Sequence, residues 1–208
     1  MKKQIASLLI AYTVATSCSF AAAIAIADTT LHYNPGPTNE NLGTGPLTLL
    51  DSNEAYYPLI KWNPADYAFG DNAIALTLVA PSSFTVSEWQ FQIRRPPSDW
   101  NESTTAATFS LVGDIVVGPP SSATRQGDSI FITSTGLQSL LNGWKDGSIA
   151  NRGIYIYAAK SGAQTPFQVF DRGAGLQGPQ IVPEPSSALL VLLGTTLVWR
   201  RKRNDRNG

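Results

Sequence analysis

The chain has 208 residues, with 15 basic and 15 acidic side chains, one histidine and one cysteine. Its formal neutrality hides an uneven distribution, because residues 28–182 contain 13 acidic and 8 basic residues, a net charge of −5. A mildly acidic region argues against nucleic-acid binding. The single cysteine and histidine argue against zinc sites built on those ligands, and a lone thiol leaves no intrachain disulfide.

The N-terminus has the layout of a secretory signal peptide. Lys2 and Lys3 precede a mostly apolar stretch, which closes with Ala25-Ile26-Ala27 before Asp28. Signal peptidase accepts small side chains at the first and third positions of such a triplet, here Ala25 and Ala27. We therefore expect residues 1–27 to be a signal peptide, cleaved after Ala27. The alternative is a permanent N-terminal membrane anchor.

Cys18 lies inside this apolar stretch. The preceding Ala15-Thr16-Ser17 faintly resembles a lipoprotein processing site, at which the cysteine would receive a lipid. A large apolar residue is usual three positions before such a cysteine, where this chain has Ala15. Ordinary cleavage after Ala27 is favoured over lipidation and would leave the mature chain without a thiol.

Residues 28–182 have the length and composition of one all-β domain. They are rich in Gly, Pro, Ser, Thr and Asn between short apolar segments, which favours strands joined by turns. In segment 84–93 the alternation places Trp89, Phe91 and Ile93 on one inward face. We expect strands at 47–50, 56–62, 73–79, 84–93, 109–117, 129–132, 153–158 and 167–170.

One segment has helical spacing instead. Leu137, Leu140, Leu141 and Trp144 recur at intervals that place them on one face of a helix. The sequence therefore predicts a β-sandwich with one short amphipathic helix at 135–144, packed over an end of the sandwich.

The C-terminal tail has three parts. Pro183-Glu184-Pro185 forms an extended spacer, because proline cannot continue a regular helix or strand ladder. The apolar run 188–199 follows, and it is shorter than the ~20 residues of a comfortable membrane span. The run predicts a C-terminal transmembrane helix, whose basic end is held on the cytoplasmic side. That end consists of Arg200, Arg201, Lys202 and Arg203.

This tail closely resembles the PEP-CTERM sorting signal. The resemblance covers residues 183–208, about the last tenth of the chain. It implies recognition by an exosortase, a membrane protease that processes such tails near the Pro-Glu-Pro motif in Gram-negative bacteria that make exopolysaccharide. The alternative is a plain C-terminal tail anchor, which the same membrane chemistry permits.

The domain between the two ends resembles a DNRLRE-type domain, also described as a family 96-like carbohydrate-binding module. One matching motif is Trp100-Asn101-Glu102-Ser103-Thr104, similar to the family's Trp-x-Glu-x-Thr. The matching segments in chain order are 28–30, 38–43, 59–62, 75–78, 100–104, 144–153 and 178–182. Glu40 and Arg152 depart from the pattern, since an aromatic is usual at both positions. The resemblance implies a jelly-roll-like β-sandwich and allows polysaccharide binding.

Sugar binding needs flat aromatic faces and planar polar groups. Tyr155 and Tyr157 share one strand face, and Arg94-Arg95 ends a strand before two prolines. The candidate carbohydrate-binding residues are Tyr155, Tyr157, Trp100, Arg94 and Arg95. The alternative is that these aromatics only pack the fold, which we expect for Trp62, Trp89 and Trp144.

No catalytic or metal-binding residue is predicted. His32 is the only histidine and is expected at the surface, and Asp99 with Glu102 is a carboxylate pair without a cleft-forming context. No cofactor is expected; calcium would suit carboxylate and carbonyl ligands, but no residues are assigned to it.

Together these features predict an exported, non-catalytic protein of the cell surface or exopolysaccharide matrix. Its expected partners are signal peptidase, an exosortase, the membrane through the C-terminal helix and, weakly, a polysaccharide. The rival hypothesis is a secreted polysaccharide-active enzyme, a lyase or glycosidase, on a similar β-sandwich.

Overall fold

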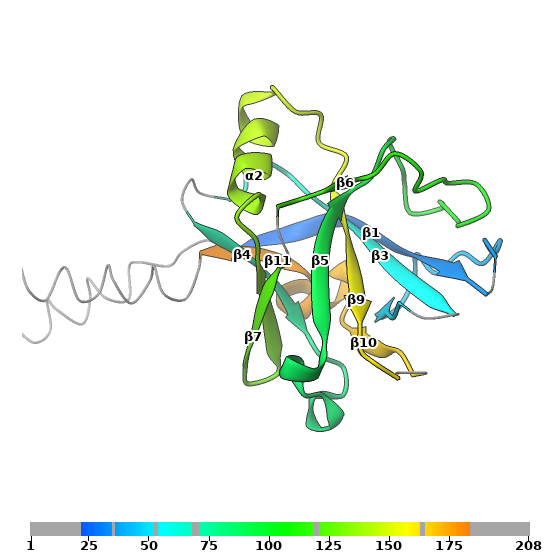
Figure 1. Cartoon of the computed structure of the whole chain (residues 1–208). Coiled ribbons are helices and arrows are strands. Elements are labelled where there is room, and N and C mark those ends of the chain that lie inside the picture. The colour runs from blue at the N-terminus through cyan, green and yellow to red at the C-terminus, as the bar shows by residue number, and fades with distance from the viewer. Residues whose placement is uncertain are drawn as a thin grey trace, which may run out of the picture.

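The computed structural model describes residues 22–34, 36–51, 54–67, 71–118, 121–162 and 165–183. Over these residues the fold is mostly β, with one short helix, which confirms the all-β part of the prediction. Nine strands form one curled antiparallel sheet in the order β6-β5-β9-β3-β1-β11-β4-β8-β7 (Figure 1). Strands β10 and β2 form a separate two-stranded sheet.

The longest strand, β1 (Ala23–Tyr33), is the corner of the curled sheet. Its first residues pair with β11 (Gln180–Pro183), and from Ala25 onward the strand pairs with β3 (Ala55–Trp62). The register shifts between Ala25 and Ala27, as at a β-bulge, which bends a strand and increases its twist. One strand thereby joins the two halves of the sheet.

The remaining strands extend the two halves. Beyond β11 lie β4 (Asn72–Thr77), β8 (Ser129–Thr133) and the edge strand β7 (Ser122–Gln126). Beyond β3 lie β9 (Ile154–Ala159), β5 (Gln90–Arg95) and the short edge strand β6 (Ile115–Val116). The halves meet again where Phe91 bridges Ser121, so the sheet curls round the core.

The main core fills the inside of this curl. Ile60, Ile74, Ile132 and Ile156 are fully buried there, each from a different strand. Helix α2 (Leu137–Asp146) closes one end of the curl, at the top of Figure 1, with Leu137, Leu140, Leu141 and Trp144 buried. β2 (Leu47–Leu49) and β10 (Phe167–Val169) contribute Leu47, Leu49 and Val169 to the same core.

A second, smaller core lies on the outer face of β1, β3 and β9. Leu31, Leu59 and Tyr155 point outward from these strands and are covered by Trp100 and Phe109 of the segment between β5 and β6. Burial on both faces explains why this half of the sheet is apolar on both sides.

Most strand predictions are confirmed, and two are wrong. In segment 84–93 only Gln90 onward is strand, since the 3-10 turns η1 (Pro81–Ser83) and η2 (Val86–Glu88) hydrogen-bond the chain to itself. Segment 109–117 is irregular except for β6, because Phe109 serves as a cover of the second core. Strand β7 was not expected: its polar sequence SATRQ is that of an edge strand with one partner. A third 3-10 segment, η3 (Arg172–Gln177), precedes β11.

Several predictions lie outside the described residues. These are the signal-peptide residues before Ala22, the sorting motif from Glu184 onward and the transmembrane helix over 188–199. Within the described part of the chain, no helix has the length and apolar character needed to cross a membrane. The predicted cleavage triplet lies inside β1, with Ala25 buried and Ala27 partly buried.

Candidate functional site

Three of the predicted sugar-binding residues come together on the outer face of β5 and β9. The register pairs Arg94 with Tyr155 and Gln92 with Tyr157, so these four side chains share one face. Tyr57 of β3 joins them, with its ring centroid 5.8 Å from that of Tyr155 and 6.0 Å from that of Tyr157. We call this group, Tyr57, Gln92, Arg94, Tyr155 and Tyr157, the tyrosine face.

Two carboxylates hold the hydroxyls of the tyrosine face. Tyr57 donates a 2.7 Å hydrogen bond to Asp51, and Tyr155 donates one to Asp114. Arg94 forms a 2.6 Å ion pair with the same carboxylate of Asp114, and its guanidinium lies 5.7 Å from the ring centroid of Tyr157. The polar groups of the tyrosine face are therefore largely bonded to one another.

These contacts keep the tyrosines neutral. A hydrogen bond to Asp51, followed by burial, raises the pKa of Tyr157 to about 12. Burial is the main cause that raises the pKa of Tyr57 and of Tyr155 far above the usual value for tyrosine. The face can thus offer part-exposed rings of Tyr57 and Tyr157 to a ligand, but few free hydrogen-bonding groups.

The other two predicted residues have different surroundings. Trp100 is buried in the second core, and its indole N–H donates a 2.6 Å hydrogen bond to the carbonyl of Arg152. Arg95 follows Arg94 on β5 and points to the opposite side of the strand. Trp100 therefore anchors the segment that covers the second core, and Arg95 is not part of the tyrosine face.

An open cleft with three aromatic rings lies at the end of the sheet opposite α2. Its volume is about 520 Å³. The ring of Phe167 lies 4.6 Å from Phe84 and 4.8 Å from Trp89, centroid to centroid. Phe84 is buried, while Trp89 and Phe167 are only partly buried. We call this site, Phe84, Trp89 and Phe167 with its lining, the aromatic cleft.

Polar side chains surround the aromatic cleft. Lys160, Ser161, Thr165 and Gln168 also line it. Lys160 forms a 2.5 Å ion pair with Glu88, and both side chains stay well exposed. The cleft thus combines aromatic ring surface with an ammonium, an amide and hydroxyls within one concavity.

Sequence reasoning assigned Trp89 to the core, and this explains why the aromatic cleft was missed. Trp89 packs against the core, but it is only partly buried and lies between the end of η2 and the start of β5. A signal was available, because Pro81 and the two serines after it predict a turn close to the aromatic residues.

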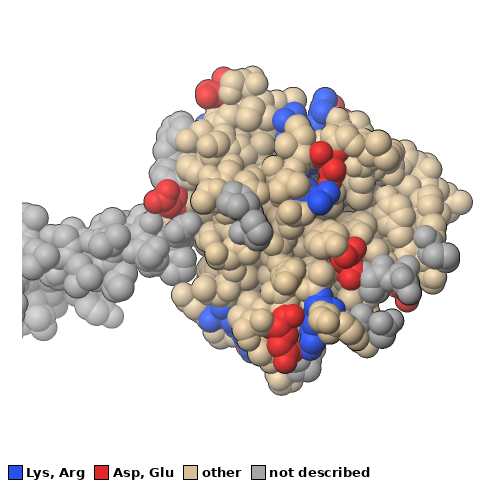
Figure 2. Space-filling model, viewed as in Figure 1, with Lys and Arg blue, Asp and Glu red and all other residues tan. Residues whose placement is uncertain are grey.

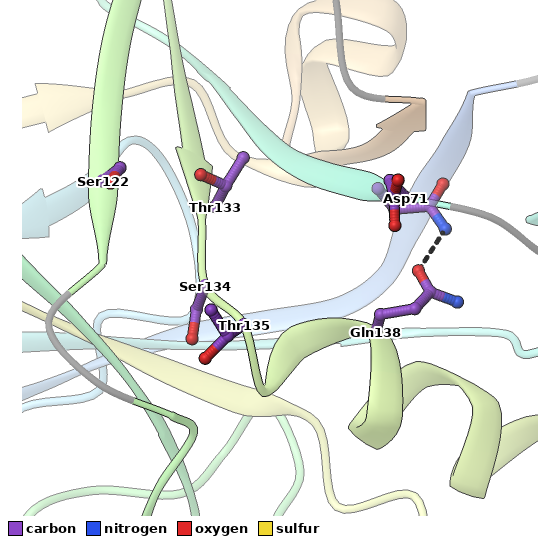
Figure 3. Close-up of a pocket in the computed structure, with 7 residues that line it drawn as sticks. Asp71, Ser122, Thr133, Ser134, Thr135 and Gln138 are labelled. Carbon is purple, nitrogen blue, oxygen red and sulfur yellow. Dashed lines mark hydrogen bonds between the residues drawn. The ribbon is translucent and has the colours of Figure 1, made fainter. Parts of the chain in front are cut away.

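A second concavity is almost entirely polar. It measures about 350 Å³ and lies between the start of β4, the end of β8 and the start of α2 (Figure 3). Asn72 donates a 3.1 Å hydrogen bond to Gln138 across it, and Ser122, Thr133, Ser134 and Thr135 contribute hydroxyls. None of the described residues that line this pocket is aromatic, so they offer no ring surface to a sugar.

His32 is buried, not at the surface as expected. The residue is 5% exposed, and its ring stacks on that of Tyr56 at a centroid distance of 4.3 Å. Its Nδ1 lies 2.6 Å from Glu40 and its Nε2 lies 3.2 Å from Glu54. Both ring nitrogens thus contact carboxylates. The histidine connects the loop that contains Glu40 to the segment before β3 that contains Glu54. Among the described residues, no cluster of three His, Cys, Asp or Glu side chains could hold a metal ion.

The charges are scattered. Figure 2 shows small blue and red groups, several of them adjacent, with wide uncharged surface between them on this face. The ion pairs Arg94–Asp114 and Lys160–Glu88 are of this mixed kind. On the face shown in Figure 2, the described residues form no basic stripe of the kind that a phosphate backbone would require.

Comparison of the sequence with protein-family models and with curated proteins gives no match. The assignment of a function therefore depends on the geometry described above and on the patterns at the two ends of the chain.

Proposed function

We propose that this chain is an exported, non-catalytic protein of the cell surface or exopolysaccharide matrix, and that its aromatic cleft binds polysaccharide weakly. The observation that carries the binding proposal is the meeting of Trp89 and Phe167 with Lys160, Thr165 and Gln168 in one open cleft. The curled sheet, on this proposal, is a jelly-roll-like β-sandwich.

The chemistry of the aromatic cleft suits a sugar ring. Sugar C–H faces pack on aromatic rings, and a few polar groups then hydrogen-bond the hydroxyls. With only two part-exposed rings, the contact area is small, and the expected dissociation constant is on the order of 0.1–1 mM. The ammonium of Lys160 is paired with Glu88, so it acts as a hydrogen-bond donor to a sugar hydroxyl and selects no charge on the glycan.

The two ends of the chain carry the export part of the proposal. Lys2 and Lys3 with the apolar stretch after them suit signal peptidase, and the Pro-Glu-Pro, apolar and Arg-rich tail suits an exosortase and a membrane. Strand β11 ends at Pro183, so the sorting tail would leave directly from a strand between β1 and β4.

Replacing Trp89 with alanine is expected to weaken binding of the host's exopolysaccharide by about tenfold, because the larger ring surface of the cleft is lost. Affinity electrophoresis of the exported protein through gels containing the polysaccharide measures this change. Gln168→Ala, on an exposed position of β10, is expected to weaken binding about threefold without loss of stability.

Tyr157→Ala is the matched control, since it removes an aromatic ring from the tyrosine face and leaves the aromatic cleft intact. Thermal melts of all variants separate lost binding from lost folding. If Tyr157→Ala abolishes binding and folded Trp89→Ala does not, the tyrosine face is the site. Product release from the polysaccharide, measured in the same samples, would favour the lyase or glycosidase alternative.

A further inference from the structure

The first residues of β1 are part of the folded domain. Ala23 is 1% exposed and pairs with Ile181 of β11. Ile24 pairs with Gln180, and the Ala25 N–H donates a 2.9 Å hydrogen bond to the carbonyl of Pro179. This short stretch is the contact through which β1 holds β11, and so joins the two halves of the sheet.

Cleavage after Ala27 would remove that contact. Ala25 pairs with Trp62, whose side chain is fully buried and whose indole N–H donates to the carbonyl of Pro179. Without residues 23–27, β11 would keep only β4 as a partner, and one side of the Trp62 environment would be open to water. Cores lose several kcal/mol when such contacts are deleted.

The same cut would also create a charge inside the sheet. Asp28 is 1% exposed and sits opposite Ile60 in the β1–β3 pair. As a new N-terminus it would carry an ammonium group at that buried position, and burying an unpaired charge is costly. A processed domain that starts at Asp28 is therefore a poor match to this fold.

We propose that signal peptidase cuts between Ala21 and Ala22, an inference that rests on the proposed export of the chain. Ser19-Phe20-Ala21 has small residues at its first and third positions and leaves all of β1 intact. The apolar stretch before it, 5–18, falls within the about 7–15 residues of a typical signal-peptide apolar region.

A competing triplet fits less well. Ala21-Ala22-Ala23 would place the cut before Ile24 and so remove Ala23, which is buried and paired with Ile181. Small residues at the first and third positions also occur in Ala23-Ile24-Ala25, Ala25-Ile26-Ala27 and Ser17-Cys18-Ser19. The first two place the cut inside β1. Ser17-Cys18-Ser19 leaves β1 intact, but only Ser19-Phe20-Ala21 also has alanine next to the cut, as in the usual Ala-x-Ala pattern.

The test is intact-mass and N-terminal analysis of the full chain after expression in a Gram-negative host with its own signal peptidase. The expected N-terminal residue is Ala22. An N-terminus at Asp28, Ile24, Phe20 or a lipid-modified Cys18 overturns the inference and leaves the export proposal standing. An uncut chain recovered from the cytoplasm overturns both.

Two variants sharpen the result. Ala21→Leu places a large side chain next to the proposed cut and should lower the processed fraction at least about tenfold in a pulse-labelling experiment. Ala27→Leu makes the same change next to the alternative cut and should be processed at the normal rate. Pulse labelling measures the processed fraction before the domain folds, so the measurement is valid for a destabilised variant too. The reverse result for the two variants overturns the inference.

Discussion

Replacing Gly153 with alanine is expected to lower the free energy of unfolding by about 3 kcal/mol, through backbone strain and a steric clash together. Gly153 has a φ of +70°, which L side chains rarely adopt, and an added Cβ would lie 2.3 Å from the carbonyl oxygen of Ile60. That carbonyl belongs to β3 beside the start of β9, so neither partner can move without disturbing the sheet. Urea unfolding followed by tryptophan fluorescence measures the change.

Gly127→Ala separates the two causes. Gly127 has a φ of +58° in the hairpin between β7 and β8, but no atom lies within 4 Å of the position of an added Cβ. Its cost should be about 1 kcal/mol, from backbone strain alone. Equal losses for the two variants would mean that the close approach to Ile60 is relieved at little cost, contrary to this prediction.

The alternating apolar pattern predicted much of the sheet because burial there is one-sided or complete. Ile74, Leu76 and Leu78 alternate, and all three are buried. Helix α2 was predicted from its spacing, with Leu137, Leu140, Leu141 and Trp144 on the buried face. Proline has no N–H to donate to a strand ladder, and Pro58 lies in the part of β3 that pairs with β1 but not with β9.

The wrong and missing strand predictions have a common physical cause. The local pattern of apolar residues does not show which distant segment covers a face of the sheet. Phe109 was predicted to lie in a strand, but it covers the outer face of strands that are far away in sequence. Strand β7 has no apolar alternation, since it is an edge strand stabilised by backbone pairing with β8. The bend of β1 at the register shift likewise has no counterpart in the amino-acid pattern.

Only part of the candidate site could be predicted from the sequence. Period-2 alternation correctly placed Tyr155 and Tyr157 on one strand face, and pairing with β5 brought Arg94 beside them. Asp51 and Asp114 accept hydrogen bonds from hydroxyls of the tyrosine face. Both come from loops, and local sequence pattern does not show where those loops lie. The aromatic cleft needs the approach of β10 to the turns before β5, a contact between segments about 80 residues apart.

The buried carboxyl of Asp28 predicts an unusual dependence of stability on pH. Burial is the largest cause that raises the pKa of Asp28 to about 6, from an ordinary value of 3.8. Its oxygen accepts a 2.7 Å hydrogen bond from the Arg172 N–H, which lowers the pKa in part. The charged groups that face it are Arg172, Asp171 and Glu102, the last of which forms an ion pair with Arg172.

The sign follows from comparing the folded and unfolded states. Below about pH 4 the carboxyl of Asp28 is protonated in both states and has no effect on the free energy of unfolding. Between about pH 4 and 6 the unfolded chain loses this proton while the folded chain keeps it, so the folded state becomes less stable as the pH rises. A raised pKa of this size corresponds to a loss of about 3 kcal/mol, fully present above about pH 6.

Asp28→Asn should remove that loss. The asparagine oxygen still accepts the hydrogen bond from Arg172, but the side chain carries no charge to bury. At pH 7.5 the variant is expected to be about 2 kcal/mol more stable than the natural chain, since the new amide group needs a partner and offsets part of the gain. At pH 4 the natural chain no longer carries this loss, and the variant is expected to be about 1 kcal/mol less stable, which is the cost of the amide group alone.

The informative measurement is the difference between the two proteins in urea unfolding at each pH from 4 to 8. Other carboxyl groups titrate in this range, but they contribute equally to both proteins and cancel in the difference. A difference that grows from about pH 4 and levels off above pH 6 is the expected result. A difference that does not change with pH would mean that the fold holds Asp28 as a carboxylate, stabilised by Arg172 more strongly than burial destabilises it.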